Sequence, residues 1–200
     1  MSTAYEETGR ARQKQRTRAA LVAAARQLVT AGGLAPTVAE AAEAAAVSRT
    51  TAYRYFPTQH SLLLAAHPEI EASSMLPAEV GDDPEVRIEA AVRGFMAMVV
   101  DTEAQQRTML RLSLETDPAT RERLPLRQGR AIAWFSEALD PVADHLGADD
   151  VRRLAIAIRA ACGIETLVWL TDIAGLTREE AIDQMVWSSV ALVRRVLQPE

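Results

Sequence analysis

The segment 48–56 holds the chain's densest group of side chains suited to binding another molecule. On a helix, which turns about 100° per residue, Arg49, Thr50, Tyr53 and Arg54 would share an arc of about 140°. Arginine can bond a guanine edge through two hydrogen bonds, threonine offers a hydroxyl and a methyl group, and a tyrosine hydroxyl can bond a phosphate. This face therefore has the chemistry to bind a nucleic-acid duplex, although the same residue types also form the solvated faces of ordinary helical bundles.

Short elements before this segment would position it. Thr37 followed by Glu40 is a capping box and predicts a helix over 38–45. The next two residues form a turn, and Ser48 can cap the second helix. Two short helices behind a supporting helix are the geometry with which a helix-turn-helix places its second helix in the major groove.

The supporting helix is predicted from apolar residues at helical spacing between Leu21 and Val29, and it is expected to end at Gly32-Gly33. Before it, every second residue from Arg10 to Arg18 is basic, and we interpret residues 1–16 as a flexible basic arm. Residues 1–66 carry eight basic and four acidic side chains, a net charge of +4, whereas the rest of the chain carries −9. This asymmetry favours an N-terminal part that approaches a polyanion, although chance can also produce it.

Two stretches in this region, 37–40 and 46–56, resemble in register the DNA-binding segment of the TetR/AcrR family of repressors. The resemblance covers about Arg16 to Leu64. It implies an N-terminal three-helix helix-turn-helix domain over 17–67 and a C-terminal helical ligand-binding and dimerisation domain over 68–200. It further implies a sequence-specific transcriptional regulator, a repressor that a small-molecule ligand releases from a pseudo-palindromic operator.

The DNA-binding set that the resemblance implies is polar and surrounds the second helix: Thr37, Ser48, Arg49, Thr50, Thr51, Tyr53, Arg54, Tyr55 and Gln59. Arg49, Thr50 and Tyr53 would meet base edges. The hydroxyls of Thr37, Thr51 and Tyr55 would touch phosphate, as would that of Tyr53, and Arg54 is a weaker candidate.

Four positions depart from the family's pattern. Gln59 stands where the family usually has lysine, so a phosphate ion pair would become a neutral hydrogen bond. Ala46 replaces the usual turn glycine, and a left-handed backbone there would cost about 1–2 kcal/mol. Ala41 and Ala52 replace larger apolar residues and predict a thinly packed domain.

Composition supports an all-α fold for the whole chain. Hydrophobic residues make up 48% and aromatic residues 4%, and no run of alternating β-branched residues indicates a strand. The C-terminal helices are expected over five ranges: 84–101, 103–115, 119–139, 149–174 and 178–197.

Two further residue sets are expected in the C-terminal domain. The ligand pocket is expected among apolar and soft residues that would equally suit a plain core: Phe95, Met98, Met109, Leu112, Trp134, Phe135 and Trp169. The last two helices carry wide apolar arcs, which predict a homodimer interface at six residues: Ile158, Cys162, Val186, Val190, Val193 and Leu197. A single intramolecular core is the alternative.

Other function classes find less support. His60 and His67 lie seven residues apart, too far for a shared metal, and Cys162 has no histidine nearby in sequence, so we expect neither an enzyme nor a metal or cofactor. No stretch of roughly 18 uncharged apolar residues predicts a membrane span, and a cytoplasmic protein without membrane association is expected. A helical adaptor without a DNA role remains the alternative, with an enzyme as the less favoured one.

Overall fold

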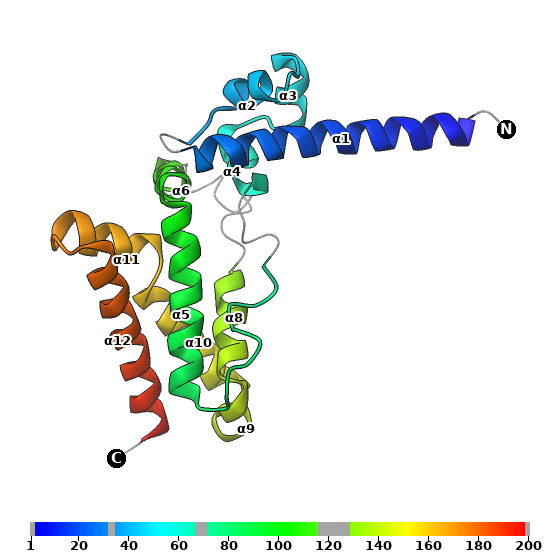
Figure 1. Cartoon of the computed structure of the whole chain (residues 1–200). Coiled ribbons are helices and arrows are strands. Elements are labelled where there is room, and N and C mark those ends of the chain that lie inside the picture. The colour runs from blue at the N-terminus through cyan, green and yellow to red at the C-terminus, as the bar shows by residue number, and fades with distance from the viewer. Residues whose placement is uncertain (1–2, 32–34, 67–71, 116–128, 199–200) are drawn as a thin grey trace. The chain divides into compact units, whose positions relative to one another are not determined.

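The computed structural model describes residues 3–31, 35–66, 72–115 and 129–198. The regular elements of these residues are all helical, which confirms the all-α prediction (Figure 1). The chain forms two compact units. Unit 1 comprises Met1–Ile70 with Ala104–Glu115, and unit 2 comprises Glu71–Glu103 with Thr116–Glu200.

Unit 1 contains a long first helix and the expected pair of short helices. Its elements are α1 (Thr3–Thr30), α2 (Val38–Ala44), α3 (Arg49–Tyr55), α4 (Gln59–Ala66) and α6 (Glu103–Glu115, all but its first residue). Leu21 and Ala25 of α1 are fully buried and pack with Val38, Phe56 and Leu62. The predicted Gly32-Gly33 stop lies outside the described residues.

The helix α6 belongs to unit 1, although the sequence analysis assigned every residue after 67 to one C-terminal domain. The buried Gln105 side chain donates a hydrogen bond of 2.6 Å to the backbone carbonyl of Leu63. Met109 is also buried and packs with Leu63 and Ala35. These contacts join residues far apart in sequence, so hydrophobic periodicity along the chain does not predict them.

The first helix also begins earlier than expected, because α1 runs without a break through the residues predicted as a flexible arm. Alanine, arginine, glutamine, lysine and glutamate, which dominate 4–18, have high helix propensity, and no proline interrupts them. The described side chains of 11–16 are all exposed. The basic run is therefore presented by a helix.

The turn between α2 and α3 closes with a left-handed residue. Ala46 has φ 53°, and it is the only non-glycine residue with positive φ in the described part of the chain. The N–H of Ala46 donates to the carbonyl of Glu43 at 3.1 Å, and the N–H of Val47 donates to that of Ala42 at 2.9 Å. This pair of bonds is a Schellman motif, which usually has glycine at the left-handed position. The left-handed backbone considered for Ala46 is therefore present.

Unit 2 is a helical bundle with short connecting helices. Its elements are α5 (Pro84–Asp101), α8 (Arg130–Ala138), the 3-10 turn η2 (Asp140–Val142), α9 (Ala143–Leu146), α10 (Ala148–Ala161), α11 (Ile164–Val168), the π-helix η3 (Trp169–Ile173) and α12 (Arg178–Leu197). α12 packs against α5 and α10, and α8 packs against α5 and α10. Two ion pairs join α5 and α12: Arg93 to Asp183 at 3.0 Å and Arg194 to Glu85 at 2.7 Å.

Three of the five helices expected after residue 84 have the predicted bounds, at α5, α6 and α12. The helix expected over 119–139 is described only from 129, and α8 spans Arg130–Ala138 of it. The helix expected over 149–174 is interrupted, because Cys162 is extended and Gly163 has φ 113°. Any other residue would be strained at this positive φ, so this break favours glycine.

One described stretch, Ala148–Ile173, is long and apolar enough to cross a membrane by length and composition. Of its most apolar window, 44% is buried inside the protein, and its α10 packs against α8 and α12. These contacts are those of a core helix of a bundle.

We expect Ala46→Gly to stabilise the protein by about 1 kcal/mol, because the relief of left-handed strain exceeds the extra chain entropy that glycine has when unfolded. Urea unfolding followed by circular dichroism measures the change. Ala44→Gly, in the helical part of α2, is the control and should destabilise instead. Equal destabilisation by both substitutions would contradict the strain at Ala46.

Candidate nucleic-acid interface

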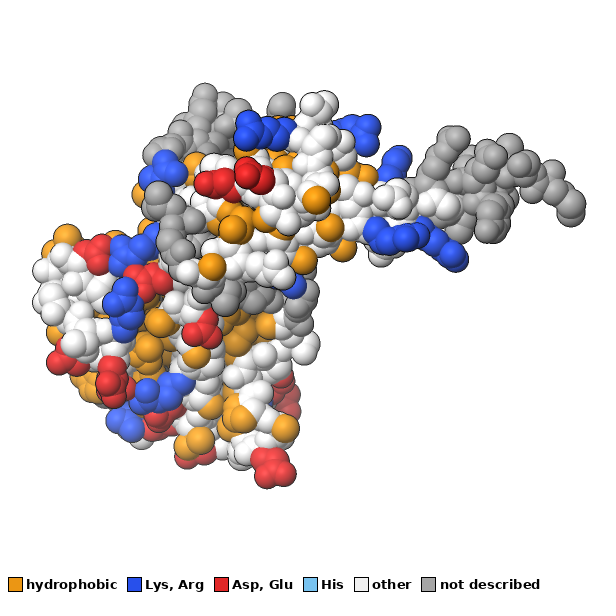
Figure 2. All heavy atoms as spheres, turned by 45° about the horizontal axis from the view of Figure 1, so that its top comes forward, with side chains coloured by type: hydrophobic (Ala, Val, Ile, Leu, Met, Phe, Trp, Pro, Cys, Tyr) orange, Lys and Arg blue, Asp and Glu red, His pale blue; other side chains and the backbone are white. Residues whose placement is uncertain are grey.

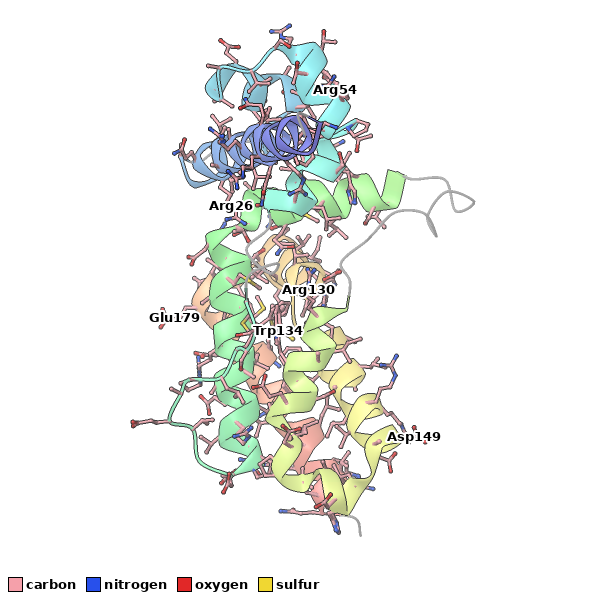
Figure 3. The ribbon with its side chains drawn as sticks, turned by 90° about the vertical axis from the view of Figure 1, so that its right-hand side faces the viewer. Arg26, Arg54, Arg130, Trp134, Asp149 and Glu179 are labelled. Atoms are coloured by element: carbon pink, nitrogen blue, oxygen red, sulfur yellow. The ribbon has the colours of Figure 1, made fainter. Side chains whose placement is uncertain are left out.

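The face predicted on the second helix is present on α3. Arg49, Thr50, Tyr53 and Arg54 are all exposed, and 47% of Tyr53 is accessible. Figure 3 labels Arg54 at the surface of this helix. The opposite side of α3 is anchored by Ala52, which is fully buried. The structure therefore brings the four residues together on one open surface.

Ser48 and Thr51 shape the N-terminus of α3. The backbone N–H of Thr51 donates to Ser48 Oγ at 3.2 Å, and the Ser48 hydroxyl donates to Thr51 Oγ1 at 2.8 Å. Ser48 is thus the N-cap that the sequence predicted. The Thr51 hydroxyl accepts this bond and keeps its own hydrogen for another acceptor.

Tyr55 is half-buried and packs against the core of unit 1. The guanidinium of Arg54 lies 5.9 Å from the centre of the Tyr55 ring. At this distance the cation is attracted to the ring face, which holds Arg54 near the C-terminal end of α3. Arg54 thus sits on the same helix end as Tyr55.

Thr37 has a structural role that competes with its predicted phosphate contact. Its hydroxyl donates to Glu40 Oε2 at 2.8 Å, its N–H donates to the same oxygen at 2.7 Å, and its Oγ1 accepts from the Glu40 N–H. These bonds lower the pKa of the Glu40 carboxyl, so the capping box is fully formed at neutral pH and weakens only as pH falls through that lowered pKa. The hydrogen of the Thr37 hydroxyl is therefore already engaged.

Gln59 does not lie as the sequence analysis expected. Its amide nitrogen donates to the carbonyls of Ala35 and Pro36, at 2.8 and 3.2 Å. A side-chain amide has two N–H donors, and both point at backbone oxygens of the same unit. Gln59 therefore fastens the start of α4 to the segment before α2, and the expected phosphate contact of its side chain is not supported.

Two arginines of α1 have roles that the charge count did not reveal. Arg26 Nε donates to the carbonyl of Ala66 at the end of α4, at 3.0 Å. The guanidinium of Arg18 lies 5.4 Å from the centre of the Phe56 ring, directly after α3. The Arg26 bond joins α1 to α4. The Arg18 contact places a cation next to the C-terminal end of α3.

The expected ligand-pocket residues are divided between the units. Met109 and Leu112 belong to unit 1, and Trp169 of unit 2 is 58% exposed. Phe95 and Trp134 do lie together there, with ring centres 6.2 Å apart, and Trp134 points between α5 and α8 (Figure 3). The remaining members of the set are Phe135, whose ring meets Phe95 edge to face at 5.7 Å, and the half-buried Met98.

The expected dimer-interface residues mostly face inward. Ile158, Cys162 and Val193 are fully buried within one chain, and Val186 is buried at 7% exposure, which corrects their assignment to an intermolecular surface. Val190 and Leu197 are half-buried. The apolar arc of α12 is therefore mainly the face that packs on α5 and α10.

Burial also makes the thiol of Cys162 unreactive. Loss of water around this side chain raises its pKa to about 12, so the thiol is protonated at neutral pH. Among the described residues, no group of three or more His, Cys, Asp and Glu side chains is placed to hold a metal ion.

These features define a class of protein: an all-α chain whose first unit presents a helix-turn-helix with an exposed polar reading face. Comparison with known proteins agrees. Residues 21–66 match the family described as bacterial regulatory proteins, tetR family. No curated protein matches the chain. A solved structure, that of a TetR transcriptional regulator from Rhodococcus sp. RHA1, is similar with 20% identity and a TM-score of 0.63, over 91% of this chain and 98% of that one.

The helix-turn-helix segment of the chain therefore matches the tetR family, and the whole chain has the fold of a TetR transcriptional regulator, with an N-terminal helix-turn-helix and a C-terminal helical region. The resemblance identified in the sequence is thereby confirmed. The family match covers α2, α3 and α4 completely and the C-terminal part of α1.

We expect Gln59→Ala to lower the free energy of unfolding by about 1–2 kcal/mol, because it removes two hydrogen bonds to backbone carbonyls. The affinity for operator DNA should stay unchanged, since the side chain does not reach phosphate. Urea unfolding and fluorescence anisotropy measure the two quantities. Gln27→Ala, at an exposed site of α1, is the control for stability. A loss of operator affinity in the folded Gln59→Ala protein would contradict this assignment.

Proposed function

We propose that the chain binds a specific operator and represses transcription there, with α3 inserted in the major groove. Arg49, Thr50 and Tyr53 read base edges, while Thr51 and Arg54 bond the flanking phosphates. The observation that carries this proposal is the exposure of Arg49, Thr50, Tyr53 and Arg54 on one face, with Ala52 buried behind them.

A homodimer is the proposed form of the regulator. α10 and α12 each expose a large apolar side chain: Ile156 is 44% exposed and Trp187 is 67% exposed. Because α10 and α12 pack against each other within one chain, a second copy placed across both helices would cover these residues. Two copies related by a twofold axis would recognise a pseudo-palindromic operator.

A small-molecule effector bound in unit 2 is proposed to release the operator in the cytoplasm. The aromatic cluster of Phe95, Trp134 and Phe135 supports an apolar binding region, and the guanidinium of Arg159 lies 5.6 Å from the centre of the Phe95 ring. A ligand that favours one arrangement of the dimer would shift the population away from the DNA-binding form. Compounds that raise the melting temperature but leave operator affinity unchanged would contradict this mechanism.

Selection of genomic fragments at two salt concentrations tests the regulator as a whole. A specific regulator retains a small set of symmetric sites at the higher salt, since base contacts persist while phosphate contacts weaken. A helical adaptor without a DNA role would retain none.

We expect Arg49→Ala to weaken binding to the selected operator by about 1–3 kcal/mol and to relax one base position in each half-site, because a bidentate contact to a base is lost. Anisotropy with operator variants measures both effects. Glu79→Ala, at an exposed site of unit 2 before α5, is the control and should leave affinity unchanged. An unaltered base preference in Arg49→Ala would move the reading role to another residue.

We expect Trp187→Asp to shift the protein from dimer to monomer, because a carboxylate replaces an apolar ring that the partner would cover. Sedimentation velocity at micromolar concentration should show a dissociation constant raised tenfold or more. Val86→Asp, at a 52% exposed apolar site of α5, is the matched control. A wild-type chain that sediments as a monomer would refute the dimer.

A further inference from the structure

We propose that the N-terminal part of α1 is a second DNA contact, in which Lys14 and Arg18 on one side of the helix bind the phosphate backbone. The opposite side, with Arg12 and Arg16, takes no part. This inference rests on the proposed function and adds to it a surface outside the helix-turn-helix.

The basic residues of α1 form two separate stripes. They occur at every second position from 10 to 18, and on a helix of about 100° per residue this spacing divides them between two faces. Lys14 and Arg18 lie one turn apart on one face. Arg12 and Arg16 lie one turn apart on another, about 160° away. The two pairs match in charge, spacing and position along the helix.

The register of α1 shows which stripe continues the core-facing side. Seven residues make about two turns, so residues seven apart share a face. Lys14 lies seven residues before Leu21, and Arg18 lies seven before Ala25, and both of these apolar residues are fully buried. The side of α1 that packs on the other helices of unit 1 therefore becomes basic toward the N-terminus.

The stripe formed by Arg12 and Arg16, here called the outer stripe, lies in register with exposed residues of α1. Arg12 lies seven residues before Ala19, and Arg16 lies seven before Ala23, and both alanines are exposed. Arg12 and Arg16 therefore continue the side of α1 that faces solvent along its length.

The stripe formed by Lys14 and Arg18, here called the inner stripe, also begins beside α3. Arg18 lies over the ring of Phe56, the C-cap of α3, at 5.4 Å from its centre. Lys14 follows one turn later, about 6 Å further along the axis. A duplex seated on α3 presents phosphates on both sides of its major groove, so a cation stripe that starts at the end of α3 fits one backbone by charge. Figure 2 shows Lys and Arg side chains along this part of α1.

A bound polyanion would also stabilise the N-terminal part of α1. All the described side chains of 11–16 are exposed, so burial in unit 1 does not stabilise this turn and a half. A helix that is polar on every side has little stability of its own, so a partner bound along it would add to the stability that its residues' propensity supplies. The chemistry of this face selects a polyanion as that partner.

The test compares Lys14→Gln with Arg16→Gln in the full chain, both at exposed sites and both to a residue of similar helix propensity. Binding to the selected operator is measured between 0.05 and about 0.3 M salt. We expect Lys14→Gln to reduce the slope of log K against log salt by about 1.8, because the dimer loses one phosphate contact in each half-site, which corresponds to about sixtyfold weaker binding at 0.1 M. Arg16→Gln should leave the slope and the affinity unchanged.

The double substitution Lys14→Gln with Arg18→Gln should reduce the slope by about 3.6, because the dimer loses four phosphate contacts. Urea unfolding of the same variants shows whether loss of the Phe56 contact affects folding. Equal losses of salt slope in Lys14→Gln and Arg16→Gln would mean that α1 acts only through its overall positive charge, and would overturn the proposal. No loss in either variant would also overturn it. A wild-type chain that selects no operator would instead overturn the proposed function.

Discussion

The backbone turn at Ala46 sets the direction in which α3 leaves α2, and every proposed base contact depends on that direction. Two hydrogen bonds of the Schellman motif close the turn, and Ser48 caps the helix that follows. Behind it, Ala52 and Phe56 are buried, so α3 cannot rotate without exposing apolar surface. Arg49 and Tyr53 are consequently presented by a fixed helix, as direct reading of base edges requires.

Unit 1 compensates for its small core residues with polar contacts to the backbone. Ala41, Ala42 and Ala52 are fully buried but fill little volume. Gln59 bonds two carbonyls before α2, Arg26 bonds the last carbonyl of α4, and Gln105 bonds that of Leu63. Each of these bonds satisfies a buried or half-buried carbonyl while tying two elements together. Unit 1 is therefore held together by these polar contacts as well as by its apolar packing.

Sequence patterns predicted those features that depend on neighbours along the chain. The caps at Thr37 and Ser48, the left-handed Ala46 and the bounds of α5 and α12 all follow from residues within one or two turns. Features set by contacts across the fold were not predictable in the same way. Ile158 and Gln59 show this, because an apolar residue on a helix looks the same whether its own chain or a partner covers it, and an amide can bond phosphate or backbone.

The arginines of unit 1 show why a charge count predicts a partner but not the residues that meet it. Arg26 bonds a carbonyl, Arg18 lies on an aromatic ring, and Arg49 is exposed on the reading face. Only the last can discriminate between bases, since phosphates are identical along the duplex. If the inner stripe of α1 binds phosphate, it supplies affinity that is independent of sequence and falls with salt, while α3 supplies discrimination. In such a regulator, substitutions on α3 can change which operator sequence is bound, while α1 still supplies the same phosphate contacts.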